Sequence, residues 1–302
     1  MLKRYGLLLL VNFGVIITLM MILNLLGVRH YLTPMGINYE SLLIFCFVYG
    51  MGGAFISLLL SKTIAKWTMG LKIVNPNSSS SYEQKLLNLI NNQARAAGLP
   101  KAPELALYDS PEVNAFATGP SKRNSLVALS TGLLNSMNEE QVEGVIAHEV
   151  SHIANGDMVT MTLLQGVINA FVMFFAKALA WAVANFMRGD DDEGQPSFWL
   201  VFAIEMAFTV IFGFLGMIVV NFFSRHREYE ADKGAAYLSG KNKIISALQG
   251  LKQEMGVSDP RGEALNNFKI SSAGKKSFFL DLLSTHPPLD SRIAALQNNT
   301  KI

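Results

Sequence analysis

Cysteine is almost absent from this sequence, and charged residues are scarce in it. The 302 residues include one cysteine, Cys46, which excludes a disulfide within the chain and a metal site built from cysteine thiolates. Charged side chains make up 16% of the residues and hydrophobic ones 50%, whereas soluble proteins carry about 25% charge. The formal net charge of +2 gives no indication of nucleic acid binding. The composition therefore favours a chain of which a large part lies in a membrane.

Long apolar runs account for this composition. They cover residues 5–28, 41–61, 158–187 and 198–223. Each run is long enough to cross a bilayer as a helix, which takes about 20 residues. The first run is longer than the apolar core of a signal peptide and ends without a convincing cleavage site, so we expect a retained span. The sequence predicts two membrane hairpins, at 1–61 and 158–223, and two polar segments, at 62–157 and 224–302.

Basic residues indicate how the spans are oriented. Those that flank one side of the spans are Lys3, Arg4, Lys62, Lys66, Lys72, Arg225 and Arg227. The other side carries Arg29 and Arg188, next to an acidic cluster at residues 190–193. Because basic residues concentrate on the cytoplasmic side, both termini and both polar segments are expected in the cytoplasm. That compartment is reducing, which agrees with the single cysteine.

The polar segments show patterns of both helix and strand. Helical patterns cover about residues 82–97, 131–135, 140–154, 224–239, 243–255 and 291–297. Short strand-like pieces lie at 105–108, 115–118 and 125–129. Residues 258–276 are rich in glycine and serine and are expected to form a loop. The polar part of the chain is therefore expected to be α+β.

The most informative motif is His148-Glu149-Val150-Ser151-His152. On a helix the two histidines are four residues apart and share one face, so both imidazoles can bind one Zn²⁺. Glu149 lies beside that face, where its carboxylate can act as a general base on water. Asn138 and Gln141 have the spacing of a capping box at the start of this helix. A surface helix with two ordinary histidines would show the same five residues, so a third ligand must be sought elsewhere.

The second polar segment offers that ligand. The third and fourth runs form an antiparallel hairpin, so the chain returns to the side where His152 lies, and Glu228 follows at about the same height. Asp232 shares the face of Glu228 and can accept a hydrogen bond from a ligand imidazole. Glu230 is the alternative ligand, but it points about 200° away and lacks an acidic residue four positions on. A solvated acidic helix face is the other interpretation of these residues.

These residues together carry a resemblance to a known family. The matching stretches are 148–157, 224–228, Ala231-Asp232, His286 and Arg292, in a chain with four apolar runs. The chain resembles the HtpX family of bacterial inner-membrane heat-shock metalloproteases and, more distantly, the type I CAAX prenyl proteases. The resemblance implies a mainly α, four-span membrane protein with a cytoplasmic α+β zincin-like domain of the gluzincin type. It also implies one Zn²⁺ per subunit, and its E-x-x-x-D pattern falls on Glu228 and Asp232.

The implied activity is zinc-dependent endopeptidase cleavage of damaged or misfolded membrane proteins in their cytoplasmic portions. Glu149 would serve as the base, and His286 or Arg292 could add a donor to the oxyanion. A histidine merely fixed in a loop by its neighbouring prolines remains an equal interpretation of His286. Asn114 and Ala115 begin a strand that could pair with an extended substrate, although an ordinary strand of a sheet would look the same.

Two functions of other classes remain open. A metal transporter would use the charged residues inside the third and fourth runs, Lys177 and Glu205, as part of a pathway. The histidine motif lies outside the runs, however, and the similar depths of these two charges favour an ion pair. A metal-binding scaffold or chaperone without hydrolysis would have no use for Glu149. The sequence therefore favours the protease.

Overall fold

The computed structural model describes residues 17–21, 23, 25, 32–33, 36–188, 196–253 and 284–298. The chain forms two compact units, one made of Met1–Ser57 with Thr162–Val220 and the other of Leu58–Met161 with Asn221–Ile302. Of the first expected span, 5–28, the described residues are helical, and the remainder lies outside the described part. The acidic cluster at 190–193 and the expected loop at 258–276 also lie outside it.

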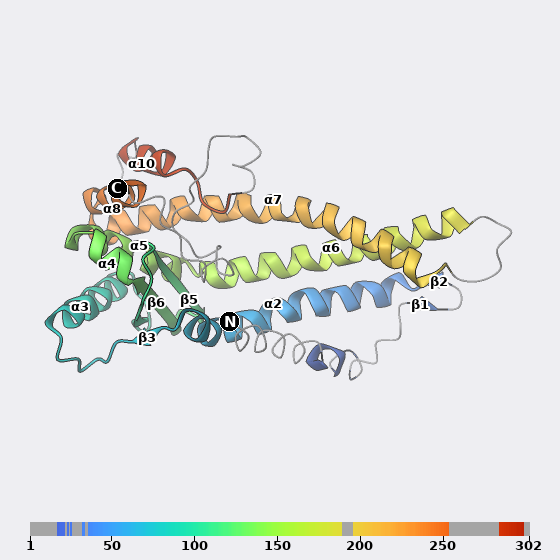
Figure 1. The fold of residues 1–302 in the computed structure, drawn as a ribbon, viewed down its shortest axis with the longest axis horizontal. Coiled ribbons are helices and arrows are strands. Elements are labelled where there is room, and N and C mark those ends of the chain that lie inside the picture. Colours follow the sequence, from blue (N-terminus) through green and yellow to red (C-terminus); the bar gives the residue numbers. More distant parts are fainter. Residues whose placement is uncertain are drawn as a thin grey trace. The chain divides into compact units, whose positions relative to one another are not determined.

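Long apolar helices build the first unit. Among the described residues, three helices are long and apolar enough to cross a membrane: α2 (Tyr39–Met69), α6 (Asp157–Arg188) and α7 (Phe198–Ser239). They contain the second, third and fourth expected spans and run side by side in this unit (Figure 1). The ends of all three continue into the second unit. A short antiparallel hairpin of β1 (Leu32–Thr33) and β2 (Gly36–Ile37) precedes α2.

Glycine lets α2 and α6 approach each other closely. A Cβ atom added at Gly50 would lie 2.6 Å from the main-chain nitrogen of Ala170 and 2.8 Å from the carbonyl oxygen of Gly166. A Cβ atom added at Gly166 would lie 2.7 Å from the sulfur of Met51. Small residues at such a contact are typical of membrane helices, where close packing of the backbones replaces the hydrophobic effect.

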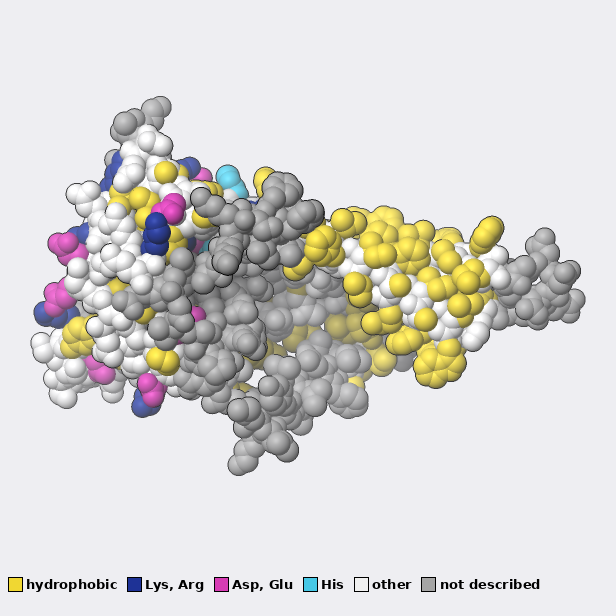
Figure 2. Space-filling view, turned by 45° about the horizontal axis from the view of Figure 1, so that its top comes forward, with side chains coloured by type: hydrophobic (Ala, Val, Ile, Leu, Met, Phe, Trp, Pro, Cys, Tyr) yellow, Lys and Arg dark blue, Asp and Glu magenta, His cyan; other side chains and the backbone are white. Residues whose placement is uncertain are grey.

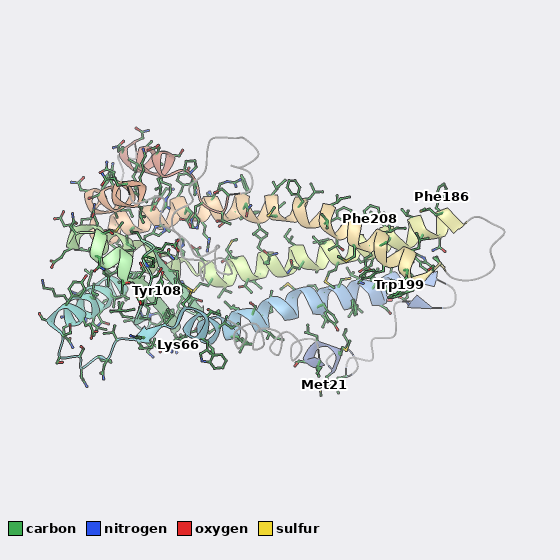
Figure 3. The ribbon with its side chains drawn as sticks, in the orientation of Figure 1. Met21, Lys66, Tyr108, Phe186, Trp199 and Phe208 are labelled. Carbon is green, nitrogen blue, oxygen red and sulfur yellow. The ribbon has the colours of Figure 1, made fainter. Side chains whose placement is uncertain are left out.

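The surface of the first unit is apolar. On the face shown in Figure 2, hydrophobic side chains (yellow) make up much of its described surface, while the charged side chains gather on the second unit. Phe186 and Trp199 are 88% and 73% exposed and project outward from their helices (Figure 3). Exposed apolar patches of this extent mark a surface that contacts something other than water. Together with the lengths of α2, α6 and α7, this surface fits a bilayer.

The second unit contains a four-stranded sheet, for which the sequence predicted three strands. Its strands are β3 (Lys72–Ile73), β4 (Glu104–Tyr108), β5 (Ala115–Ser121) and β6 (Asn124–Ser130), in the order β3-β4-β6-β5. β5 and β6 form an antiparallel hairpin, and β4 runs parallel to β6. The register shifts between Thr118 and Ser121, where Gly119 has a φ of 141°, a conformation that favours glycine. In the order β3-β4-β6-β5, the strand β5 lies at one edge of the sheet, and a tight turn joins it to β6.

Helices pack against this sheet to form the core of the second unit. They are α3 (Ser81–Ala96), α4 (Thr131–Ser136), α5 (Glu139–Asn155), α8 (Lys241–Gln253) and α10 (Leu289–Asn298). Buried residues of the sheet and of α5, such as Val127, Ile146 and Val150, share one core cluster with Leu248 of α8. Gly144 allows α5 and α8 to meet, because a Cβ atom there would lie 2.7 Å from the carbonyl oxygen of Lys243.

The helix α5 has well-defined ends. The expected capping box is present: Asn138 accepts a hydrogen bond from the main-chain nitrogen of Gln141, and the Gln141 side chain accepts one in return. At the other end Gly156 takes a left-handed conformation with a φ of 76°, and its N–H caps the carbonyls of His152 and Ile153. This break separates α5 from α6, which begins at Asp157, and turns the start of α6 back toward the end of α5.

Candidate metal centre

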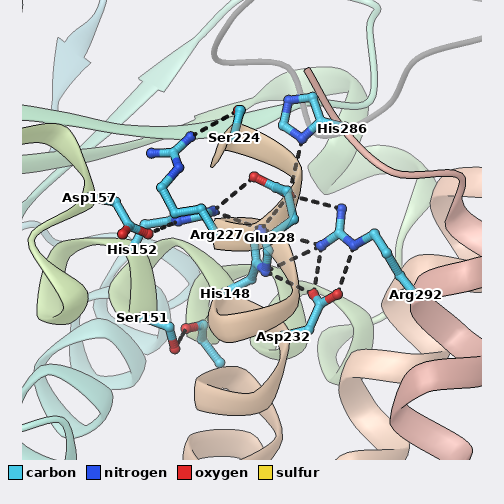
Figure 4. A network of polar contacts seen from close by, with 11 residues as sticks. His148, Ser151, His152, Asp157, Ser224, Arg227, Glu228, Asp232, His286 and Arg292 are labelled. Carbon is cyan, nitrogen blue, oxygen red and sulfur yellow. Dashed lines mark hydrogen bonds and ion pairs between the residues drawn. The ribbon is translucent and has the colours of Figure 1, made fainter. Parts of the chain in front are cut away.

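Three side chains of the second unit converge at the point where α5 and α7 meet. His148 and His152 lie on one face of α5, and Glu228 lies on α7 (Figure 4). Their nearest atoms are separated by similar distances: 3.1 Å between the two Nε2 atoms, and 3.4 Å from each Nε2 to a Glu228 carboxylate oxygen. All three side chains are buried.

This spacing fits a bound metal ion. Zinc binds histidine nitrogen and carboxylate oxygen at about 2.0–2.2 Å, so the ligand atoms of a tetrahedral site lie about 3.3 Å apart. The observed 3.1–3.4 Å matches that edge length. Two imidazoles and one carboxylate are the ligand set of a hydrolytic site with a fourth position left for water or substrate. The Glu228 carboxylate is buried among nitrogen atoms of His148, His152, His286 and Arg292 at 3.0–3.4 Å, an arrangement that keeps it ionised and available to a cation.

The remaining nitrogen of each imidazole has an acidic partner. Nδ1 of His148 lies 3.0 Å from Asp232, and Nδ1 of His152 lies 2.6 Å from Asp157. A carboxylate that accepts the Nδ1 hydrogen fixes the tautomer in which Nε2 has a free lone pair, as a metal ligand requires. Asp232 was expected from its position on α7.

Asp157 was not singled out by the sequence reasoning. It is 6% exposed and stands at the first position of α6, five residues after His152. The glycine that precedes it could have indicated the contact, because a helix that stops at Gly156 can return an acidic side chain to its own last turn.

Arg292 and His286 approach the same group of residues from the C-terminal segment. Arg292 is fully buried and donates two hydrogen bonds to Asp232, at 2.7 and 2.6 Å, while its third nitrogen lies 3.1 Å from Glu228. Nδ1 of His286 lies 3.0 Å from Glu228. Both side chains therefore contact carboxylates of the site, and the positive charge of Arg292 compensates part of the buried negative charge.

The pKa values in the site reflect these contacts. Burial alone would lower the pKa of His148, but its hydrogen bonds with Asp232 and Glu228 raise that pKa to about 9. Burial would raise the pKa of Glu228, yet His286 and Arg292 hold it well below its usual range. Arg292 likewise lowers the pKa of Asp232 against the effect of burial. Both carboxylates are thus ionised at neutral pH, the form that binds a cation or an imidazole N–H.

Burial distinguishes the two remaining glutamates, the expected base Glu149 and the alternative ligand Glu230. Glu149 is buried on α5 directly after His148, with 3% of its surface exposed. Glu230, the alternative ligand, is exposed and pairs with Lys233 at 2.7 Å on the outer face of α7. α7 can lie close to α5 because of Gly234, where a Cβ atom would lie 2.6 Å from the hydroxyl oxygen of Ser151.

The expected substrate-binding residues lie at the start of the edge strand. The main-chain N–H of Asn114 donates to the hydroxyl oxygen of Ser130 at 3.1 Å, and its carbonyl accepts from the main-chain N–H of Ser130 at 3.0 Å; Ala115 begins β5. The side-chain oxygen of Asn114 is buried and has no hydrogen-bond partner among the described residues. Ala115 is 0% exposed, so this edge is closed to solvent in the present conformation, as is the metal centre.

Comparisons with known proteins agree with this geometry. The profile of peptidase family M48 matches residues 80–300. Protease HtpX of Shewanella oneidensis is 48% identical over 297 residues, which cover 98% of this chain and 99% of the relative. A protease HtpX homolog of Bacillus licheniformis is 48% identical over 302 residues, with the same two coverages.

A solved structure shares the fold. The crystal structure of S. mikatae Ste24p superposes with a TM-score of 0.61 at 18% sequence identity, over 98% of this chain and 64% of the longer Ste24p chain. The resemblance found in the sequence is thus confirmed over nearly the whole length. With its apolar helices and its buried group of two histidines and a glutamate, the chain belongs to peptidase family M48 and is a membrane-associated metalloprotease.

Proposed function

We propose that the chain is a zinc-dependent endopeptidase of the bacterial inner membrane, with its active site and both termini in the cytoplasm. Its substrates would be damaged or misfolded membrane proteins, cut in their cytoplasmic portions as part of a stress response. The observation that carries the proposal is the spacing of 3.1–3.4 Å among the ligand atoms of His148, His152 and Glu228. The basic residues that flank α2 and α7 support the orientation.

Each residue of the site has a defined task. His148, His152 and Glu228 would hold the zinc, and Asp157 and Asp232 keep the two imidazoles in the binding tautomer. When bound, the zinc supplies Lewis-acid chemistry that lowers the pKa of water and polarises a carbonyl group. Glu149 accepts the proton of the attacking water and passes it to the nitrogen of the leaving amine.

His286 is the better of the two expected oxyanion donors. The guanidinium of Arg292 is already engaged by Asp232 and Glu228. Nε2 of His286 has no hydrogen-bond partner among the described residues, and it can therefore donate to a developing oxyanion. Arg292 then acts as a positioning residue, since it holds Asp232 against His148.

A substrate would bind in extended form along β5. The strand is the edge of the sheet and has no partner on its outer side among the described strands. An extended peptide can add to such an edge through main-chain hydrogen bonds. Because Ala115 and the metal ligands are buried, this edge and the metal centre must open before a substrate can bind.

The test compares the wild type with Glu149→Gln, both purified in detergent, freed of metal, and then given zinc and an unfolded protein substrate. Wild-type cleavage should depend on added zinc. Glu149→Gln should bind zinc as the wild type does, because all three ligands remain, but should cleave at least about 100-fold more slowly. Retained cleavage in this variant would contradict the role of Glu149. A wild type that binds zinc and never cleaves would instead favour the scaffold or chaperone.

A further inference from the structure

We propose that this enzyme preferentially cuts its substrates close to the bilayer, within about ten residues of the end of a transmembrane segment. The proposal rests on the proposed function and adds where along a membrane protein the cut is made. Three observations carry it: the short distance along the chain from the candidate metal site to the apolar runs of α6 and α7, the polar contacts of the β5–β6 turn, and the direction of β5.

The first limit comes from α6. Asp157 is the first residue of this helix and its carboxylate lies 2.6 Å from the ligand His152. The apolar stretch that can cross the membrane, Asp157–Met187, has 31 residues. The hydrocarbon core takes up about 20 of them, so its edge lies at most about 11 residues, or roughly 16 Å, from Asp157. The expected metal ligand His152 is in direct contact with Asp157 and therefore lies at a similar distance from the hydrocarbon edge.

The second limit comes independently from α7. Residues 198–223 carry no charge except Glu205, so about six residues remain beyond the 20 needed for a span. The ligand Glu228 follows five residues after this run on the same unbroken helix. It therefore lies at most about 11 residues, or roughly 16 Å, from the hydrocarbon edge. Both helices thus give a maximum distance of roughly 16 Å between the site and the hydrocarbon edge. The headgroup layer takes up about 5–8 Å of that distance.

The turn between β5 and β6 contacts two residues of the second unit that adjoin apolar runs of the chain. Lys62, the first charged residue after the apolar run of α2, reaches the Asn124 side chain at 2.9 Å. Lys122 donates a hydrogen bond to the carbonyl of Ala154, in the last turn before α6. Lys122 and Arg123 are exposed and give the turn a positive charge, which suits acidic headgroups.

These contacts set the direction of β5. Its last residue, Ser121, adjoins the turn that contacts Lys62 and Ala154, two residues next to apolar runs of the chain, while Ala115 lies at the opposite end. On this proposal, a chain that leaves the bilayer enters the strand from the end at Ser121. In extended form it covers 16 Å with about five residues. Segments farther along a flexible tail must loop back, and their effective concentration at the site falls with about the −3/2 power of the tail length.

The test uses the full-length protein reconstituted in liposomes of phosphatidylethanolamine and phosphatidylglycerol. The substrate is a single transmembrane segment followed by five identical unfolded repeats of ten residues, and mass spectrometry quantifies cleavage in each repeat. Cleavage should be greatest in the first repeat and about tenfold lower in the fifth. A second substrate with a Gly-Ser spacer of 20 residues before the repeats should lose about fivefold of its first-repeat cleavage. The same repeats without a span, added in solution, should show no such gradient.

Equal cleavage of all five repeats, or cleavage that begins only at the second or a later repeat, would overturn the proposal, because the site would then lie far from the bilayer. Such results would leave the proposed function intact, since cleavage itself would still occur and vanish in Glu149→Gln. Failure to cut either the tethered or the soluble repeats in the presence of zinc would instead overturn the proposed function, and this inference with it.

Discussion

Lys177 on α6 and Glu205 on α7 form an ion pair, with 2.7 Å between Nζ and a carboxylate oxygen. The ring of Phe45 on α2 lies 5.9 Å from the same Nζ atom. The long helices α2, α6 and α7 therefore meet at one charged side chain. The ion pair expected from the similar depths of these residues is present, and it removes the main support for a transport pathway.

This pair predicts a non-additive effect on stability. Lys177→Met should destabilise the protein by about 3 kcal/mol, because it leaves the carboxylate of Glu205 without its partner in an apolar surrounding. The double change Lys177→Met with Glu205→Leu should cost less than Lys177→Met alone. Unfolding in mixed micelles measures the three variants, and a coupling energy near zero would show that the two charges do not stabilise each other.

The two glutamates of α7 should differ sharply. Glu228→Gln removes a ligand and should lower zinc affinity by more than the 10–100-fold expected for an outer partner, and abolish cleavage. Glu230→Gln is the matched control, because Glu230 is exposed and forms an ion pair with Lys233 on the surface of the same helix. It should keep both properties within about twofold, as surface pairs contribute little. Elemental analysis of zinc decides, and the reverse order of effects would refute the assignment of Glu228.

Replacing Asp157 should lower the affinity for zinc more than it lowers the stability of the metal-free protein. Asp157→Asn should weaken zinc affinity by about 10–100-fold, because the amide is a poorer acceptor for the Nδ1 hydrogen of His152. Competition with a chelator measures that affinity. Glu140→Gln removes the same charge from an exposed position on α5 and should leave zinc binding unchanged. If Asp157→Asn changed only the unfolding of the metal-free protein, its carboxylate would serve the start of α6 alone.

The close approach of α5 and α7 at Gly234 gives a steric prediction. Gly234→Ala places a Cβ atom 2.6 Å from the hydroxyl and 2.9 Å from Cβ of Ser151, so α7 must shift and Glu228 with it. We expect a loss of stability of about 1–3 kcal/mol together with weaker zinc binding. Gly213→Ala is the control on the same helix, since nothing lies within 4 Å of a Cβ atom there. Ser151→Gly should rescue Gly234→Ala, and absence of rescue would argue against this contact.

Much of the secondary structure could be predicted because periodicity and end signals are local. The capping box at Asn138 and the strands that became β4, β5 and β6 followed from a few neighbouring residues. The end of α2 could not be predicted. The apolar run ends at residue 61, but the helix continues to Met69, and in this last part Lys62 and Lys66 pair with Glu104 at 2.7 and 3.1 Å. That contact depends on the fold of the sheet.

In the candidate site, too, local sequence patterns predict some residues, whereas only tertiary packing brings in the others. His148, Glu149 and His152 are visible as one helical pattern, and the spacing of Glu228 and Asp232 selects one face of α7. The partners of Arg292 could not be read from the sequence, because Asp232 and Glu228 lie about 60 residues away and are reached only through tertiary packing. β3 escaped prediction for a simpler reason: two residues, Lys72 and Ile73, carry no periodicity.

The order of the ligands along the chain has a consequence for biosynthesis. His148 and His152 leave the ribosome before the third apolar run, whereas Glu228 follows the fourth. A nascent chain that has made α5 but not α7 lacks Glu228, and it also lacks Asp232 and Arg292, which contact His148 and each other. With the ligands proposed above, the metal site can therefore be complete only once α6 and α7 have been made and Glu228 has been brought back to α5. A chain that stops before α7 would lack one of the three proposed ligands and could not hold the metal with this set.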